Sequence, residues 1–217
     1  MLMRCLRAAG LTALVALALT HGAAVAQETG PATGDAQRGA RLGYTCLGCH
    51  GIPNYKNVAP VYRVPKLYGQ HADYLVLALQ AYRSSERGHA TMHSHAISMT
   101  DQDMADVAAY LAGTPIESDP NRPAVGKAPE AAQVCVACHG NDGVGIVPQY
   151  PTLTGQYADY LARSLHDYKR GGRKNAVMTG FASTLSDSDI AALAEYYSKQ
   201  APALQVSPKR VTRFSER

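Results

Sequence analysis

The stretch Cys46-Leu47-Gly48-Cys49-His50 has the C-x-x-C-H pattern of a covalent haem attachment site. The two thiols lie about one helical turn apart and can each add to a haem vinyl group, while the adjacent imidazole reaches the iron. The same pattern returns as Cys135-Val136-Ala137-Cys138-His139. Two copies in one chain predict two covalently bound haem c groups, with His50 and His139 as iron ligands.

The N-terminal segment has the features of a secretory signal peptide. Arg4 and Arg7 precede an apolar stretch from Leu11 to Leu19, and small residues follow at Ala24-Val25-Ala26. This arrangement predicts cleavage after Ala26 and export of the mature protein. No later segment reaches the roughly 20 apolar residues that a membrane span requires, so we expect no integral span after cleavage.

The cysteines and the charge limit the remaining possibilities. Once Cys5 leaves with the signal peptide, four cysteines remain and all belong to the two haem motifs, so no structural disulfide is available. The formal net charge of +4 falls by two when Arg4 and Arg7 are removed, and the haem propionates offset most of the remainder. We therefore expect no nucleic-acid partner.

An internal repeat covers most of the chain. Residues 69–75, Gly-Gln-His-Ala-Asp-Tyr-Leu, recur 86 positions later as Gly-Gln-Tyr-Ala-Asp-Tyr-Leu at 155–161. The same offset places Pro65 on Pro151. Because identical glycines and prolines do not follow from a shared helical period, the two halves are interpreted as a tandem duplication. The haem motifs themselves are 89 positions apart, so the first haem loop carries three extra residues near 55–61.

Apolar spacing and capping residues predict where the helices lie. Asp35 is the expected N-cap of a helix that runs into Cys46, and residues 51–70, with three prolines, are expected to form an irregular loop. Thr100 is the expected N-cap of the last helix of the first half. The apolar faces are formed by Leu75, Ala78, Leu79 and Tyr82 in one helix, and by Met104, Val107, Ala108 and Leu111 in the next. Residues 83–95 and 175–180 are expected to be loops.

The function of each haem depends on the ligand opposite the histidine. After His139 the chain has one methionine, Met178, and one further histidine, His166, which lies beside the apolar stripe of a predicted helix. We therefore expect Met178 to ligate the second iron. A thioether ligand favours ferrous iron and raises the potential.

The first half offers more candidates for this ligand. Counting back from the last helix places Met92 on Met178, and Met92 is the expected ligand of the first iron. The same stretch also contains His89, His93, His95 and Met99, each of which could reach the iron if the loop closed differently. A histidine in this position would lower the potential.

Pro65 and Pro151 lie at the same distance before the Gly-Gln pair of each half. The backbone carbonyl of each could accept the Nδ1 proton of the haem-ligating histidine, which would fix the ring and tune the iron. The two prolines could equally serve only to shape the loop.

On these residues the chain resembles the di-haem class I cytochromes c of the cytochrome c4 type. The resemblance covers about Asp35 to Gln200. It depends on the paired haem motifs and on the Gly-Gln…Tyr-Leu helix starts. It also depends on Met178 ahead of the stretch 185–190 and on the stretch 99–104 in the first half. It implies an all-α fold of two tandem class I cytochrome c domains, packed about a pseudo-twofold axis and each wrapped around a covalent haem. It also implies hydrogen bonds from His50 and His139 to the carbonyls of Pro65 and Pro151.

The expected organisation is a signal peptide at 1–26, a first cytochrome domain at 35–113, a proline-rich linker at 114–124, a second domain at 125–203 and a C-terminal tail at 204–217. The resemblance implies an electron carrier in the periplasm that delivers electrons towards a terminal oxidase.

Three functions remain to be compared. The leading interpretation is an electron carrier, not an enzyme, that cycles its irons between ferric and ferrous. Its expected partners are a membrane quinol-oxidising complex, a terminal oxidase or a periplasmic dehydrogenase. The alternatives are a dedicated electron-accepting subunit of such a dehydrogenase, and a di-haem peroxidase with one open iron. The peroxidase is disfavoured because both halves offer a methionine ligand, and a zinc or dithiol module does not explain the histidine that follows each cysteine pair.

Overall fold

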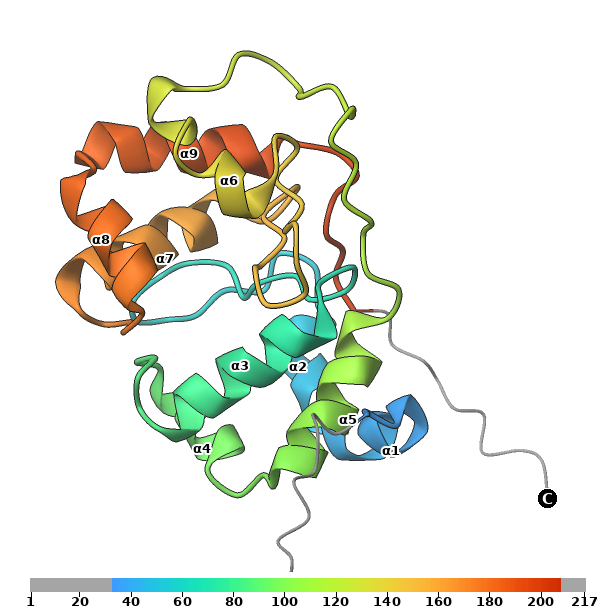
Figure 1. The fold of residues 1–217 in the computed structure, drawn as a ribbon. Coiled ribbons are helices and arrows are strands. Elements are labelled where there is room, and N and C mark those ends of the chain that lie inside the picture. The colour runs from blue at the N-terminus through green and yellow to red at the C-terminus, as the bar shows by residue number, and fades with distance from the viewer. Residues whose placement is uncertain (1–32, 208–217) are drawn as a thin grey trace, which may run out of the picture. The chain divides into compact units, whose positions relative to one another are not determined.

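The computed structural model describes residues 33–207, and its helices fall into two sets that follow the sequence repeat (Figure 1). The first set is α1 Ala36–Leu42, the 3-10 helix η1 Gly43–Cys46, α2 Leu47–His50, α3 Ala72–Arg83, α4 Ala90–Ala96 and α5 Asp101–Ala112. The second set is the 3-10 helix η2 Glu130–Ala132, α6 Val136–His139, α7 Ala158–Arg170, α8 Ala176–Thr184 and α9 Asp187–Ser198. Residues 33–207 contain isolated β-bridges but no strand. The predicted signal peptide at 1–26 lies outside the described residues.

The duplication is visible in the helix boundaries. Helices α3, α4 and α5 begin 86 positions before α7, α8 and α9 respectively. The caps repeat as well, because Thr100 and Asp103 form a capping box at α5, and Ser186 and Asp189 form one at α9. In each box the hydroxyl accepts from one backbone N–H and the carboxylate from another, which satisfies two donors that the helix leaves unpaired.

The core of each half forms around its last helix. In the first half α5 packs against α1 and α3, and in the second α9 packs against α7. The predicted stripe of Met104, Val107, Ala108 and Leu111 is buried, as is the equivalent stripe of Ile190, Leu193, Ala194 and Tyr197. Helix α1 crosses α5 closely at Gly39, where a Cβ atom would lie 1.9 Å from the carbonyl oxygen of Asp106. Only glycine permits this approach.

Two stretches expected to be loops are helical. Residues 90–96 form α4 and residues 176–184 form α8, so the loop predictions for 83–95 and 175–180 were wrong over these ranges. Helices of seven and nine residues make too few turns to show an apolar period. Their starts are fixed by side chains of His89 and Asn175, which accept hydrogen bonds from the backbone N–H groups of Met92 and Met178.

The connections between the halves are extended. Residues 113–129 contain no helix, as the prolines predict. Residues 204–207, at the start of the predicted C-terminal tail, pack against the rest of the protein. Gln205 exchanges backbone hydrogen bonds of 2.9 and 3.0 Å with Tyr68, and Leu204 is buried. The hydroxyl of Ser207 donates to the carbonyl of Leu111. The chain after the second domain therefore packs against the first.

Candidate functional site: two haem cavities

Each haem motif includes a short helix that ends at the motif histidine. Cys46 ends η1 and is followed by α2, which carries Cys49 and His50; Cys135 precedes α6, which carries the second cysteine and histidine. None of these four cysteines forms a disulfide. Both pairs of thiols are therefore available for thioether bonds to a haem.

Each motif histidine is held by a proline carbonyl. Nδ1 of His50 lies 2.9 Å from the carbonyl oxygen of Pro65, and Nδ1 of His139 lies 2.9 Å from that of Pro151. Because a carbonyl can only accept, Nδ1 carries the proton and Nε2 keeps the lone pair that a metal requires. Sequence spacing alone had left this contact open.

Burial keeps both imidazoles neutral. It lowers the pKa of His50 to about 4 and also lowers the pKa of His139, and in both cases the proline carbonyl opposes the shift. Metal ligation needs the neutral ring, so both side chains are prepared for it near neutral pH.

A cavity lies beside each motif and contains the predicted residues of that half. The first has a volume of about 130 Å³, and its lining includes Cys46, Cys49, His50 and Met92. The second has a volume of about 340 Å³, and its lining includes Cys135, Cys138, His139 and Met178. Both walls are otherwise mainly apolar, and the thiols, imidazole and thioether in each match the donor set of a c-type haem. The residues present therefore fit the cofactor.

The alternative ligands differ in their positions. His93 is outside the lining of the first cavity, and its Nδ1 lies 2.8 Å from the carbonyl oxygen of Tyr82. His89 lines the cavity but serves as the N-cap of α4, and its Nε2 lies 3.3 Å from Oδ1 of Asn57. His95 and Met99 also line the cavity. In the second half His166 is not among the residues that line the cavity.

The two haem loops are joined by paired glutamine contacts that sequence analysis did not identify. The Gln70 side chain donates to the carbonyl of Thr152 and accepts from its N–H, both at 2.9 Å. Gln156 makes the equivalent pair with Lys66 at 2.9 and 3.0 Å. Lys66 and Thr152 directly follow Pro65 and Pro151. In each half, one short backbone segment therefore contacts the haem histidine of that half and the glutamine of the other half. The recurring Gly-Gln pair was the available signal.

Comparison with known proteins decides the family. A family model described as cytochrome c matches residues 36–115, and one described as cytochrome c oxidase, cbb3-type, subunit III matches residues 126–196. Cytochrome c4 of Thiocapsa roseopersicina is 35% identical over 186 residues, which are 78% of this chain and 95% of the relative. The chain belongs to the cytochrome c4 family.

Two further proteins are similar to this chain. The crystal structure of reduced recombinant cytochrome c4 from Pseudomonas stutzeri has a TM-score of 0.59 at 29% identity, over 77% of this chain and 100% of that one. The thiosulfate dehydrogenase electron acceptor of Stutzerimonas stutzeri strain A1501 is 33% identical over 171 residues, which are 70% of this chain and 77% of the relative.

These findings confirm the predicted fold class and cofactors. The protein has two tandem cytochrome c domains, is all-α over its described residues, and carries two covalently bound haem c groups. It is a di-haem electron-transfer protein and not an enzyme. Within residues 33–207, no helix is long and apolar enough to cross a bilayer.

Proposed function

We propose that this cytochrome is a periplasmic shuttle whose two irons are each coordinated on both faces, by His50 and Met92 in the first domain and by His139 and Met178 in the second. The observation that carries the proposal is that each cavity is lined by its own cysteine pair and histidine together with that methionine. Each haem supplies a ferric/ferrous couple. The chain supplies the ligands, their orientation and an apolar surrounding that sets the potential.

The remaining site residues orient these ligands. The thioether bonds to Cys46 and Cys49, and to Cys135 and Cys138, fix each haem in its domain. The carbonyls of Pro65 and Pro151 keep each imidazole in the tautomer that binds iron. With a methionine closing the other face, neither iron offers a position for a substrate, so the chemistry is limited to electron transfer.

The proposal extends to the location and the partners, and it depends on the predicted signal peptide and on the resemblance to the cytochrome c4 family. The signal peptide at 1–26 directs export to the periplasm, where the protein accepts electrons from a membrane quinol-oxidising complex and delivers them to a terminal oxidase. The proposed domains at 35–113 and 125–203, joined by the linker at 114–124, are supported by the family matches at 36–115 and 126–196.

Carbon monoxide binding to the reduced protein tests the closed coordination. The wild type should bind little carbon monoxide, because each iron already holds two strong ligands. Met92→Ala should open one haem and Met178→Ala the other, so each variant should bind about one carbon monoxide per chain. Ready binding by the wild type would reject closed coordination and favour a haem with an open catalytic position.

A second candidate is a dedicated electron acceptor for a thiosulfate-oxidising enzyme. It is favoured by the likeness to the thiosulfate dehydrogenase electron acceptor of Stutzerimonas stutzeri. Stopped-flow reduction by thiosulfate and a thiosulfate dehydrogenase should be compared with reduction by a quinol-oxidising complex. Fast reduction by the dehydrogenase alone would assign this role, and fast reduction by the quinol complex alone would assign the respiratory shuttle.

A further inference from the structure

Two buried arginines related by the repeat lie between the haem cavities. Arg87 and Arg173 are each 7% exposed, and their backbones form an antiparallel bridge. Gly88 N–H donates to the carbonyl of Gly172, and Lys174 N–H to that of Glu86, both at 2.7 Å. Arg87 lines both cavities, whereas Arg173 lines only the second. Arg87 is therefore the cation that the two haem sites share.

The two arginines differ in their counter-charges. Nε of Arg173 lies 4.0 Å from a carboxylate oxygen of Asp167. The residue equivalent to Asp167 in the first half is Ala81, which carries no charge. Within residues 33–207 no carboxylate forms an ion pair with Arg87, and its buried Nε has no hydrogen-bond partner. The first of the two cations is left without an anion.

The guanidinium of Arg87 contacts three tyrosine side chains. Its guanidinium donates to the hydroxyl of Tyr160 at 2.7 Å and to that of Tyr74 at 3.3 Å, and it lies 4.6 Å from the ring centre of Tyr82. Burial raises the pKa of Tyr160, but Arg87 and Arg173 outweigh burial and lower that pKa to about 8. Both guanidinium groups therefore act on the Tyr160 hydroxyl in this buried region.

A buried cation is costly unless an anion accompanies it. Each haem brings two propionate carboxylates, and these are the anions that a filled cavity supplies. We propose that Arg87 is the shared counter-ion of the two haems, with its guanidinium paired to a propionate of each. This inference depends on the two haems and not on the identity of the methionine ligands.

The shared cation has an electrostatic consequence for both irons. A positive charge beside a haem favours the ferrous state, which carries one positive charge fewer than the ferric state. Arg87 should therefore raise both potentials, and Arg173 should act mainly on the second haem.

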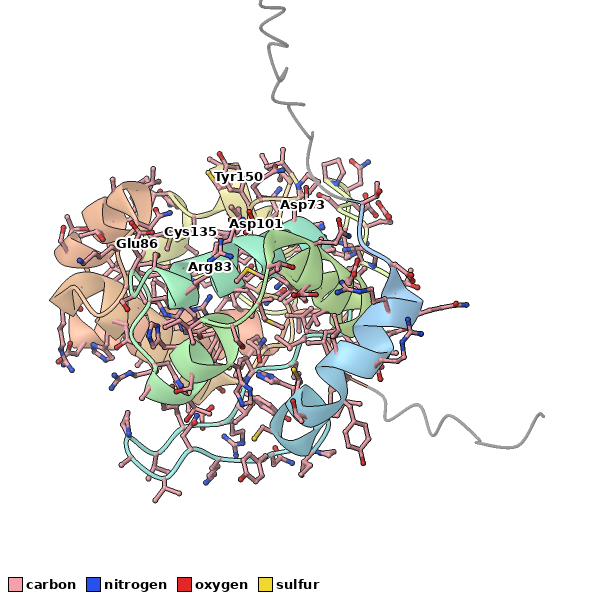
Figure 2. The ribbon with its side chains drawn as sticks, turned by 90° about the horizontal axis from the view of Figure 1, so that it is seen from below. Asp73, Arg83, Glu86, Asp101, Cys135 and Tyr150 are labelled. Atoms are coloured by element: carbon pink, nitrogen blue, oxygen red, sulfur yellow. The ribbon has the colours of Figure 1, made fainter. Side chains whose placement is uncertain are left out.

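Redox titration of the holo-protein tests the assignment, with the haems distinguished by their NMR methyl resonances. Arg87→Gln should shift the equilibrium of both haems towards the ferric state by about tenfold. This shift lowers each potential by about 59 mV for a one-electron couple. Arg173→Gln should shift mainly the second haem. The matched control is Arg83→Gln, because Arg83 lines neither cavity and pairs with Asp101 at 2.6 Å (Figure 2). If Arg87→Gln leaves either haem at its wild-type potential, the shared counter-ion is rejected.

A second set of variants separates charge from structure. If Arg87 only holds the two tyrosine hydroxyls, then the double variant Tyr74→Phe/Tyr160→Phe should reproduce the potential shift, and this result would overturn the proposal. We expect that double variant to shift the potentials much less than Arg87→Gln does. Arg87→Lys keeps the positive charge and should therefore keep both potentials close to those of the wild type. Resonance Raman bands of the propionates should change in Arg87→Gln and Arg87→Lys for both haems. Unchanged bands in both variants would also reject the pairing.

Discussion

At the scale of single residues, the potential of each haem depends on the pair of side chains on its iron. Pro65 and Pro151 anchor the imidazole with identical contacts of 2.9 Å, so the two proximal sides are equivalent. The distal sides differ in their surroundings, because His89, His95 and Met99 lie beside Met92 in the first cavity and no second histidine accompanies Met178 in the other. We therefore expect the proposed ligand of the first haem to be the easier of the two to exchange.

Replacing Met92 by histidine tests this ligand directly. Met92→His should lower the potential of one haem, because imidazole favours ferric iron more than a thioether does, and should leave the other potential unchanged. His95→Ala and Met99→Leu serve as controls and should keep the wild-type spectrum of the oxidised protein. Loss of the methionine-to-iron band in Met99→Leu would instead assign Met99 as the ligand.

The sequence predicted the covalent chemistry at this scale but not the charges between the haems. The C-x-x-C-H pattern carries its chemistry in five consecutive residues, so it can be recognised without a structure. Arg87 and Arg173 lie in polar stretches and resemble ordinary surface arginines. Their burial depends on contacts between two halves of the chain, which no local pattern contains.

At the scale of elements, the short helices α4 and α8 deliver the proposed methionine ligands. Met92 and Met178 each follow their N-cap by three residues, and the cap side chain accepts from the N–H of that methionine. The cap therefore fixes the backbone of the ligand itself. Sequence reasoning missed both helices because their length hides the apolar period. The cap of α4 is a histidine, which is uncommon at this position, whereas Asn175 of α8 is a common cap residue and was an available signal.

Removing the cap of α8 should loosen the ligand that it carries. Asn175→Ala should lower the free energy of unfolding by about 1 kcal/mol and increase the rate of carbon monoxide binding to one reduced haem. Ser186→Ala is the matched control, because it removes the cap of α9, which carries no ligand. It should cost similar stability without faster binding. Equal rates in the two variants would show that the cap does not hold the ligand.

The capping box of α5 should make the first domain sensitive to acid. Hydrogen bonds from Thr100, with a further contribution from Arg38, lower the pKa of Asp103 to about 2. Because the folded pKa lies below the unfolded value of about 3.9, the contribution of Asp103 to stability is present above pH 4 and disappears as pH falls towards 2. Thermal unfolding of Asp103→Asn should show a smaller loss of stability over this range than the wild type. An unchanged pH dependence would contradict the assignment.

At the scale of the whole molecule, the haem loops join the two domains. The Gln70–Thr152 and Gln156–Lys66 pairs are related by the repeat offset, and both glutamines are buried. The repeat could be read from the sequence, and it predicted equivalent elements correctly. It could not predict which faces meet, because these contacts use backbone groups of irregular loops. The packing of residues 204–207 against the first domain was hidden for the same reason.

Removing one glutamine pair should weaken the contact between the domains. Gln70→Leu leaves the buried N–H and carbonyl of Thr152 without partners and should lower the free energy of unfolding by about 1–3 kcal/mol. Internal electron transfer, measured after rapid reduction of one haem, should become slower. Gln149→Leu is the control, because its contact with Asp73 is exposed, and it should change stability by less than about 0.5 kcal/mol. Similar effects of the two variants would contradict a special role for the buried pair.

The central claim is that both haems of this cytochrome are closed by a histidine and a methionine. The most direct measurement is the far-red methionine-to-ferric-iron absorption of the oxidised wild-type protein, divided by its haem content. The account predicts two haems per chain and a band strong enough for both. A band that accounts for one haem or for none would contradict it.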